Sequence, residues 1–186
     1  MEVEALKKQL LFIHGGGHGA YEAGRHMAMT LQSLLGPAYE ICCPRMPDED
    51  SPDYAAWRGL IEERLTAGNG NAIAVGHSLG ASVLLKLLSE SHTSPPIAGL
   101  FLLAPPYWGA VDWEVGDYAL REGFASKLPS ALPIFIYHSR DDEIVPFDHL
   151  ARYADKLPGA VCRELDGGGH LFHNVLGAVA RDIAAP

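Results

Sequence analysis

The chain of 186 residues has little cysteine and an excess of negative charge. Its three cysteines, two of them adjacent, are odd in number and lack zinc-site spacing, so they predict neither a disulfide framework nor a metal centre. Fourteen Lys and Arg against twenty-three Asp and Glu give a net charge of −9, and the basic residues form no cluster suited to nucleic acid or an anionic membrane. This cysteine usage is typical of a reducing compartment, and we expect a cytoplasmic protein.

The sequence also lacks a continuous apolar run of the length that a membrane-spanning helix needs. Two stretches without charged residues, 69–85 and 93–111, are interrupted by glycine or proline. Residues 1–9 alternate charged and apolar residues and lack the apolar segment of a secretory signal. The sequence therefore predicts neither a membrane protein nor an exported one, and it identifies no protein partner.

Short apolar runs bounded by Gly, Pro or Asp recur along the chain and predict buried strands. The six runs are 10–13, 40–43, 72–75, 100–103, 134–137 and 161–165. Apolar residues follow helical spacing over 54–65, 83–88 and 172–183. We therefore predict a single α/β domain over residues 1–186, built as a three-layer α/β/α sandwich with a mostly parallel sheet of about six strands.

Residues 105–129 are too long for a simple connection between the fourth and fifth predicted strands, and they carry several aromatic side chains. An insertion after a strand of an open α/β sheet lies where ligands usually bind. The segment is therefore either a short cap over a substrate or a helix that packs its aromatic side chains into the core. If it is a cap, Trp108, Trp113 and Phe124 are the candidates to line an acyl-binding site.

Residues 76–80 read Gly-His-Ser-Leu-Gly and fit the G-x-S-x-G nucleophile elbow between a predicted strand and a predicted helix. In such an elbow the serine lies on a sharp turn, where small flanking residues let its Oγ project into a cleft. The N-terminus of the following helix then faces a developing oxyanion. The alternative is a glycine-rich helix start in which Ser78 serves only as the N-cap.

Three more polar segments follow predicted strands and so lie at the same edge of the sheet as Ser78. Residues 14–17 read His-Gly-Gly-Gly, residues 139–146 supply acidic side chains, and residues 167–170 end in a histidine. Taken singly, these segments are a flexible turn, a solvated acidic turn and a histidine at a helix start. Together they place an oxyanion loop, a serine, an acid and a histidine in the chain order of an α/β-hydrolase.

On these residues, the sequence resembles the α/β-hydrolase superfamily over nearly its whole length. Its size and its Met46-Pro47-Asp48 segment are similar to the small single-domain serine hydrolases typified by retinoblastoma-binding protein nine and related bacterial proteins. The resemblance implies a shortened α/β-hydrolase fold without the N-terminal antiparallel hairpin of larger members. It also implies catalysis without a cofactor. The His-Gly-Gly-Gly form of the first loop is more typical of lipases and esterases.

The resemblance makes Ser78 the nucleophile, His170 the general base and Asp142 the acid that orients the imidazole. In the family the acid is followed by two residues and then an apolar-Pro pair, a register that Asp142 fits and that leaves Asp141 one residue early. Asp141 remains the alternative acid. His173 competes with His170, but we expect it on the first turn of the C-terminal helix, while the base needs a loop position.

The resemblance also implies an oxyanion hole formed by the backbone N–H of Leu79 and one from Gly15 or Gly16. The expected reaction is hydrolysis of a small carboxylic ester through an acyl-enzyme on Ser78, with a small acyl ester as the partner molecule. A thioester or an amide could serve as substrate for the same triad. A non-enzymatic binding module that keeps the hydrolase fold is the alternative from another class.

The other histidines have weaker claims to a function. Glycine-spaced histidines on a loop are a weak ligand set, so we expect no metal site at the three near the N-terminus. These three are His14, His18 and His26. We expect the remaining four only at surface or wall positions. They are His77, His92, His138 and His149.

Overall fold

The computed structural model describes residues 6–67, 71–91, 96–111, 113–114 and 116–185. Within them, six parallel strands form one sheet in the order β2-β1-β3-β4-β5-β6. The strands are β1 (Lys8–Ile13), β2 (Tyr39–Cys42), β3 (Ala72–His77), β4 (Ile97–Leu103), β5 (Ile134–Ser139) and β6 (Val161–Leu165). Each predicted strand overlaps one of them, and the predicted α/β fold is confirmed.

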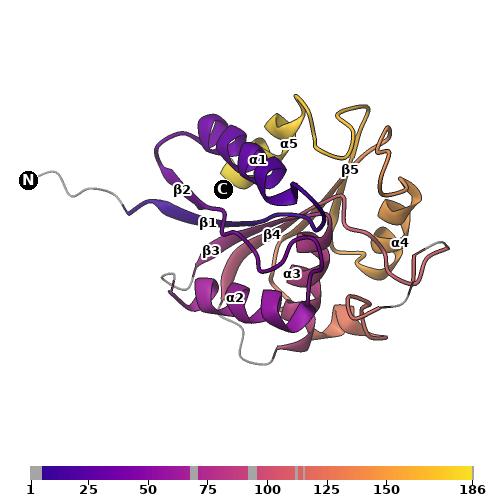
Figure 1. The fold of residues 1–186 in the computed structure, drawn as a ribbon. Helices are drawn as coiled ribbons and strands as arrows, with labels where there is room; N and C mark the ends of the chain where they lie inside the picture. The colour runs from indigo at the N-terminus through magenta and orange to yellow at the C-terminus, as the bar shows by residue number, and fades with distance from the viewer. Residues whose placement is uncertain (1–5, 68–70, 92–95, 112, 115, 186) are drawn as a thin grey trace, which may run out of the picture.

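Helices cover both faces of the sheet (Figure 1). One face carries α1 (Ala20–Leu35) and α5 (Leu176–Ala184), and the other carries α2 (Tyr54–Ala67), α3 (Leu79–Glu90) and α4 (Asp148–Lys156). Alternate side chains of a strand enter opposite layers: Phe12 packs beneath α1 and α5, whereas Leu11 and Ile13 pack toward α2 and α3. Burial on both faces explains why the central strands β3 and β4 are almost wholly apolar, whereas the edge strands β2 and β6 carry exposed charged residues.

The helices differ from the prediction in number and in one boundary. Both α1 and α4 are additional to the three predicted helices, and α5 begins at Leu176, later than predicted. Phe172 and Asn174 have positive φ values of 55° and 62°, which an α-helix does not accommodate, so residues 171–175 form turns. The expectation that His173 lies on the first turn of this helix is therefore wrong.

The strand order reverses between β1 and β3. After β1 the chain passes to β2 on one side, and after β2 it passes to β3 on the other side of β1. In open α/β folds, ligands bind at such a switch point, outside the carboxyl ends of the strands. The segments that leave the sheet at this point are residues 14–19 and the turn at Ser78.

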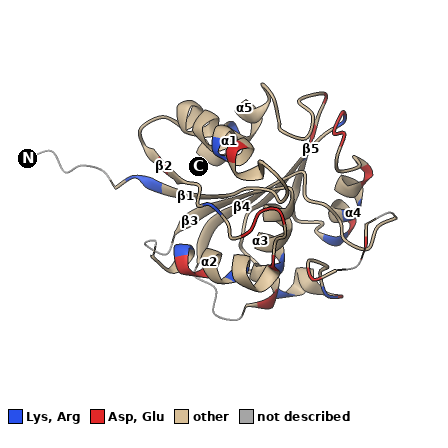
Figure 2. Ribbon diagram, viewed as in Figure 1, with Lys and Arg blue, Asp and Glu red and all other residues tan. Residues whose placement is uncertain are grey.

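Charged residues of both signs lie on the same helices, as α2 and α4 show in Figure 2. Arg58 and Glu62 pair at 3.0 Å on α2, and Arg152 and Asp148 pair at 3.4 Å on α4. Such pairs on partly exposed helix faces contribute little to stability. None of the helices in the described ranges is long and apolar enough to cross a membrane.

Candidate active site

Ser78 occupies the sharp turn between β3 and α3. Its backbone has φ 51° and ψ −121°, which is strained for a residue with a side chain, and its hydroxyl makes no capping hydrogen bond to α3. The Ser78 N–H donates to the carbonyl of Leu103 on β4 at 2.8 Å, which anchors the turn to the sheet. The N-cap alternative therefore lacks the hydrogen bond that defines it.

Two glycines let this turn pack closely. A Cβ on Gly76 would lie 2.6 Å from the Cα of Ala81, and a Cβ on Gly80 would lie 2.4 Å from the carbonyl oxygens of Ile13 and His14. These are contacts with backbone, which cannot rotate aside as a flexible side chain does. The first turn of α3 therefore rests directly on the end of β1, where the glycine loop begins.

The glycine loop contacts the elbow. A Cβ on Gly15 would lie 3.3 Å from the Cβ of Ser78, and one on Gly16 would lie 2.7 Å from Cδ2 of Leu79. The two backbone N–H groups expected in the oxyanion hole, that of Leu79 and one from Gly15 or Gly16, thus come from two segments in contact with each other. A carbonyl bound near Ser78 would be within reach of both segments.

His14 holds the glycine loop in place and is not available as a ligand. Its buried ring accepts the N–H of Met46 at Nε2 (3.0 Å) and donates from Nδ1 to the carbonyl of Gly15 (2.7 Å). Burial lowers the pKa of His14, which keeps the ring neutral. His18 and His26 are exposed. Among the described residues, no group of three or more His, Cys, Asp or Glu side chains could hold a metal ion.

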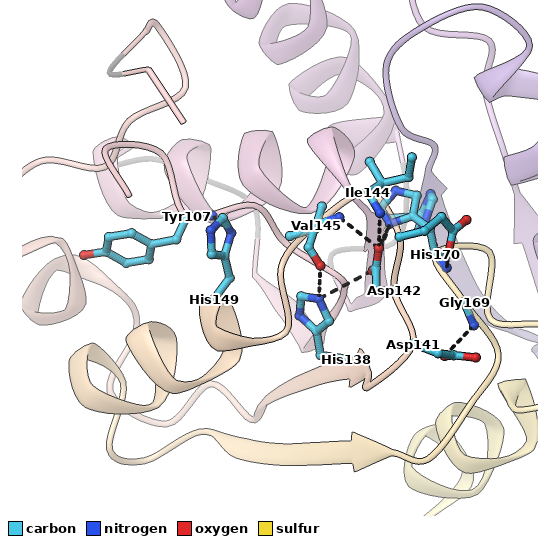
Figure 3. Close-up of polar contacts among 11 residues, drawn as sticks. Tyr107, His138, Asp141, Asp142, Ile144, Val145, His149, Gly169 and His170 are labelled. Carbon is cyan, nitrogen blue, oxygen red and sulfur yellow. Dashed lines mark hydrogen bonds and ion pairs between the residues drawn. The ribbon is translucent and has the colours of Figure 1, made fainter. Parts of the chain in front are cut away.

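Asp142 and His170 come together from the turns after β5 and β6 (Figure 3). Nδ1 of His170 lies 2.9 Å from Oδ2 and 3.1 Å from Oδ1 of Asp142. Burial raises the pKa of Asp142, but hydrogen bonds from His138, His170 and the N–H of Val145 outweigh burial and hold that pKa well below its ordinary value. An ionised carboxylate only accepts hydrogen bonds, so Nδ1 of His170 donates to Asp142 and Nε2 is the nitrogen left to act as a base.

The remaining polar groups of His170 are also engaged. Its N–H donates to Oε2 of Glu143 at 3.2 Å, and its carbonyl accepts from Nε2 of His77 at 2.8 Å. The preceding N–H, that of Gly169, donates to Asp141 at 2.9 Å. Within the described part of the chain, Nε2 is thus the one polar atom of His170 left for a reacting group.

His77 joins the His170 loop to the elbow, because it directly precedes Ser78. Its ring lies 4.7 Å from the His170 ring, and burial lowers the pKa of His77 to about 3, so the ring is neutral. No hydrogen bond joins His170 to the Ser78 hydroxyl among the described residues. In unliganded enzymes this contact is often long and tightens when substrate binds.

The alternative acid and base lie elsewhere. Asp141 is exposed and binds the N–H of Gly169 instead of the imidazole. His173 is also exposed, whereas His170 is 8% exposed beside Asp142. The geometry therefore favours Asp142 and His170 over their neighbours.

The insertion of residues 105–129 consists of turns and one short 3-10 helix, Phe124–Lys127. Positions 112 and 115 lie outside the described residues. Phe124 is 6% exposed and packs into the core with residues of α3, as the core-packing alternative predicts.

Trp108 is hydrogen-bonded to α3, and Trp113 packs against Trp108. Nε1 of Trp108 donates to Oγ of Ser82 at 3.0 Å, and the two indole rings meet edge to face at 5.2 Å. Ser82 is one helical turn after Ser78, which places the partly exposed ring of Trp108 near the elbow. Trp113 also packs against His149 at 5.5 Å.

Several histidines lie deeper than expected. His77 is 4% exposed, His138 is fully buried and His149 is 1% exposed, so of the two expected placements, surface or wall, these three do not lie at the surface; His92 lies outside the described residues. Sequence reasoning also missed Glu143. Two features of the sequence could have pointed to these residues: His77 lies inside the elbow, and Glu143 directly follows the acid Asp142.

The sequence pattern of the serine hydrolase family matches residues 16–175. The chain belongs to the serine hydrolase family. Among its relatives is YdeN of Bacillus subtilis (strain 168), a hydrolase by name, which is 23% identical over 171 residues covering 91% of this chain and 88% of YdeN.

Solved structures share the fold of this serine hydrolase. The ydeN gene product of B. subtilis matches with a TM-score of 0.75 and 19% identity, covering 95% of this chain and 97% of that one. CarC, a serine hydrolase involved in carbazole degradation, matches with a TM-score of 0.71 and 15% identity, covering 96% and 90%. Est1E from Butyrivibrio proteoclasticus matches with a TM-score of 0.67 and 18% identity, covering 96% and 86%. The serine hydrolase therefore has an α/β-hydrolase fold.

Proposed function

We propose that this serine hydrolase cleaves small carboxylic esters through an acyl-enzyme on Ser78. The observation that carries the proposal is the state of His170. Its Nδ1 is hydrogen-bonded to the buried carboxylate of Asp142, its backbone is held on both sides, and its Nε2 is free. His77 joins this loop to the strained turn of Ser78. An imidazole in this state is suited to act as a general base.

In the proposed reaction, Nε2 of His170 takes the hydroxyl proton of Ser78 while Oγ bonds to the ester carbonyl carbon. The charge of Asp142 stabilises the imidazolium that forms. The bond from carbon to the alcohol oxygen then breaks as His170 returns the proton to that oxygen. Water, deprotonated by the same imidazole, next attacks the acyl carbon. The bond from that carbon to Oγ of Ser78 then breaks as His170 returns the proton to Oγ, which releases the carboxylic acid and restores Ser78.

The oxyanion of each tetrahedral intermediate needs donors already in place. We assign these to the N–H of Leu79 and one from Gly15 or Gly16, because these segments contact each other beside Ser78. The N-terminus of α3 adds its partial positive charge. One such donor contributes on the order of a hundredfold to a thousandfold in kcat in related chemistry.

The acyl group would lie against Trp108 and Trp113. Trp108 is hydrogen-bonded to Ser82 of α3 and Trp113 packs edge to face on Trp108, so we assign these two rings as a short apolar wall. A small apolar site gains about 0.8 kcal/mol for each added methylene until it is full, and then it rejects longer chains. We therefore assign acetyl to butyryl esters as the preferred substrates.

A panel of p-nitrophenyl esters from acetyl to decanoyl tests this proposal, with a butyryl thioester and a butyryl amide beside it. We expect kcat/KM to rise with the length of the acyl chain up to about four carbons, and to be lower again for chains of about ten carbons. A steady rise through the long chains would refute the short acyl site, and preference for the thioester or amide would move the assignment to that leaving group. Turnover of none of them would favour a binding module.

A further inference from the structure

We propose that His138 is a positioning residue for Asp142: it holds the turn that delivers the carboxylate to His170 and directs an N–H toward that carboxylate. The inference rests on the proposed function, because it concerns the same triad. His138 lies on β5, four residues before Asp142, and it is fully buried.

His138 contacts both Asp142 and Val145, and Val145 in turn contacts Asp142 (Figure 3). Its Nε2 lies 2.9 Å from the carbonyl oxygen of Val145 and 3.4 Å from Oδ2 of Asp142. Both neighbours are acceptors, so Nε2 carries the proton and donates chiefly to the carbonyl. The N–H of Val145 donates in turn to Oδ1 of Asp142 at 2.8 Å. His138 thus anchors the residue whose own N–H orients the carboxylate.

The other ring nitrogen of His138 shows that packing alone does not explain an imidazole here. Nδ1 is buried and has no hydrogen-bond partner among the described residues. A buried unpaired polar atom lowers stability, and an apolar side chain would avoid that loss. The ring also packs edge to face on Phe147 at 5.7 Å, a contact that a phenyl ring would make equally well. The Nε2–H is therefore the feature that the position requires.

The carboxylate of Asp142 lies between two imidazoles. Oδ2 is 2.9 Å from Nδ1 of His170 and 3.4 Å from Nε2 of His138, while Oδ1 accepts the N–H groups of Ile144 and Val145. Without the His138 donor, the turn loses its anchor at Val145 and the carboxylate is free to rotate away from His170. The imidazole then loses control of its tautomer, which lowers kcat. KM stays near its original value, because His138 is not placed against the substrate.

Three substitutions separate the N–H from the shape of the ring. His138→Gln places an amide nitrogen near the position of Nε2, His138→Asn carries the same group on a stem too short to reach Val145, and His138→Phe keeps a ring without a donor. Ser139→Ala is the matched control, because Ser139 is fully buried beside His138 and its Oγ has no partner. On a short ester, we expect kcat to fall about tenfold to a hundredfold in the Asn and Phe variants, a fraction of the loss from removing the triad acid. The Gln variant and the control stay within about threefold.

Proton NMR gives a readout that needs no turnover. The Nδ1 proton of His170, bonded to a carboxylate, is expected as a low-field resonance in the unmodified protein, in His138→Gln and in Ser139→Ala. It should be lost or broadened in His138→Asn and His138→Phe, as in Asp142→Asn. If the unmodified protein hydrolyses no ester but the resonance follows this pattern, the proposed function fails and the role of His138 stands.

Other outcomes refute the role of His138. Unchanged kcat and an unchanged resonance in the Asn and Phe variants would show that Asp142 needs no second imidazole. A Gln variant as impaired as the Phe variant would show that ring shape matters and the N–H does not. If the variants fail to fold by circular dichroism, nitrogen-15 shifts of His138 in the unmodified protein decide. The Nε2–H tautomer is expected, and the Nδ1–H tautomer would contradict the proposal.

Discussion

Three consecutive acidic residues, Asp141, Asp142 and Glu143, contact the His170 loop through different atoms. Asp141 accepts a hydrogen bond from the N–H of Gly169, and Asp142 accepts one from Nδ1 of His170. Glu143 accepts one from the backbone N–H of His170. Successive side chains that leave a strand point in different directions, so each reaches a different part of the loop. Of the three, Asp142 has the carboxylate with no exposed surface.

We expect Asp142→Asn to lower kcat by roughly ten-thousandfold, because the amide cannot hold the proton on Nδ1 and carries no charge to stabilise the imidazolium. Asp141→Asn serves as the matched control and should cost less than about tenfold, since the amide oxygen can still accept the N–H of Gly169. Both variants are assayed on a short ester with folding checked by circular dichroism. If Asp141→Asn is inactive and Asp142→Asn active, the acid has been assigned one residue too late.

The sequence supports prediction of these residues only in part. Ser78 and His170 lie after predicted strands, and the resemblance to the hydrolases supplies the register for Asp142. The burial of His77 and His138 was not predicted, because an isolated histidine has no periodic signal. Their hydrogen-bond partners are carbonyl groups of turns, which local sequence does not place: that of His170 for His77 and that of Val145 for His138.

The unit of β3, elbow and α3 depends on close backbone approach. Gly80 faces two carbonyl oxygens at the end of β1. A Cβ on Gly80 would lie only 2.4 Å from each of them. Gly59, on the exposed face of α2, has nothing within 4 Å of a Cβ. The same substitution should therefore have opposite effects at these two positions.

Gly80→Ala should lower the free energy of unfolding by about 3 kcal/mol, because the methyl group meets backbone that must shift. Gly59→Ala, its control, should raise it by about 0.5–1 kcal/mol, since alanine loses less conformational entropy in a helix interior. Urea unfolding followed by circular dichroism measures both. A tolerated alanine at Gly80 would mean that α3 does not rest on the end of β1 as described.

At the scale of elements, apolar composition made the strands predictable, because each of the six runs overlaps a strand of one sheet whose central strands are buried. Helix α1 was harder to recognise, since it contains Gly24 together with Thr30 and Ser33, all weaker helix formers than alanine. The start of α5 depends on the positive φ values at Phe172 and Asn174. These angles belong to the turns of the His170 loop, where the N–H of His173 donates to the carbonyl of Gly168 at 2.8 Å, and helical spacing in the sequence does not reveal such turns.

For the molecule as a whole, buried neutral histidines link folding to pH. Burial lowers the pKa of His14, and it lowers the pKa of His77 to about 3. In the unfolded chain these rings take up a proton below about pH 6.5, whereas the folded state resists protonation, so stability falls as pH falls below that value. Asp142 affects stability at lower pH. Its pKa is depressed in the folded state, so its contribution to the free energy of unfolding is present above about pH 4 and is lost in stronger acid.

His77→Gln should make the free energy of unfolding less dependent on pH. Between about pH 6 and 4 we expect its slope to be shallower than that of the unmodified protein by up to about 1.4 kcal/mol per pH unit, because one buried titrating group has been removed. His18→Gln is the control, since the His18 side chain is 98% exposed and the same substitution there removes a histidine without disturbing the core. Parallel slopes for His77→Gln and the unmodified protein would show that His77 is not held neutral by the fold.

The most direct measurement of the central claim is covalent labelling by a fluorophosphonate, read as intact mass. The reagent phosphonylates a serine only when the hydroxyl is activated by a base and the oxyanion is stabilised, and it requires no knowledge of the natural ester. We predict a single adduct on the unmodified protein and none on Ser78→Ala, with circular dichroism showing both to be folded. No adduct at high reagent concentration, or an adduct that survives in Ser78→Ala, would contradict the assignment of Ser78 as an activated nucleophile.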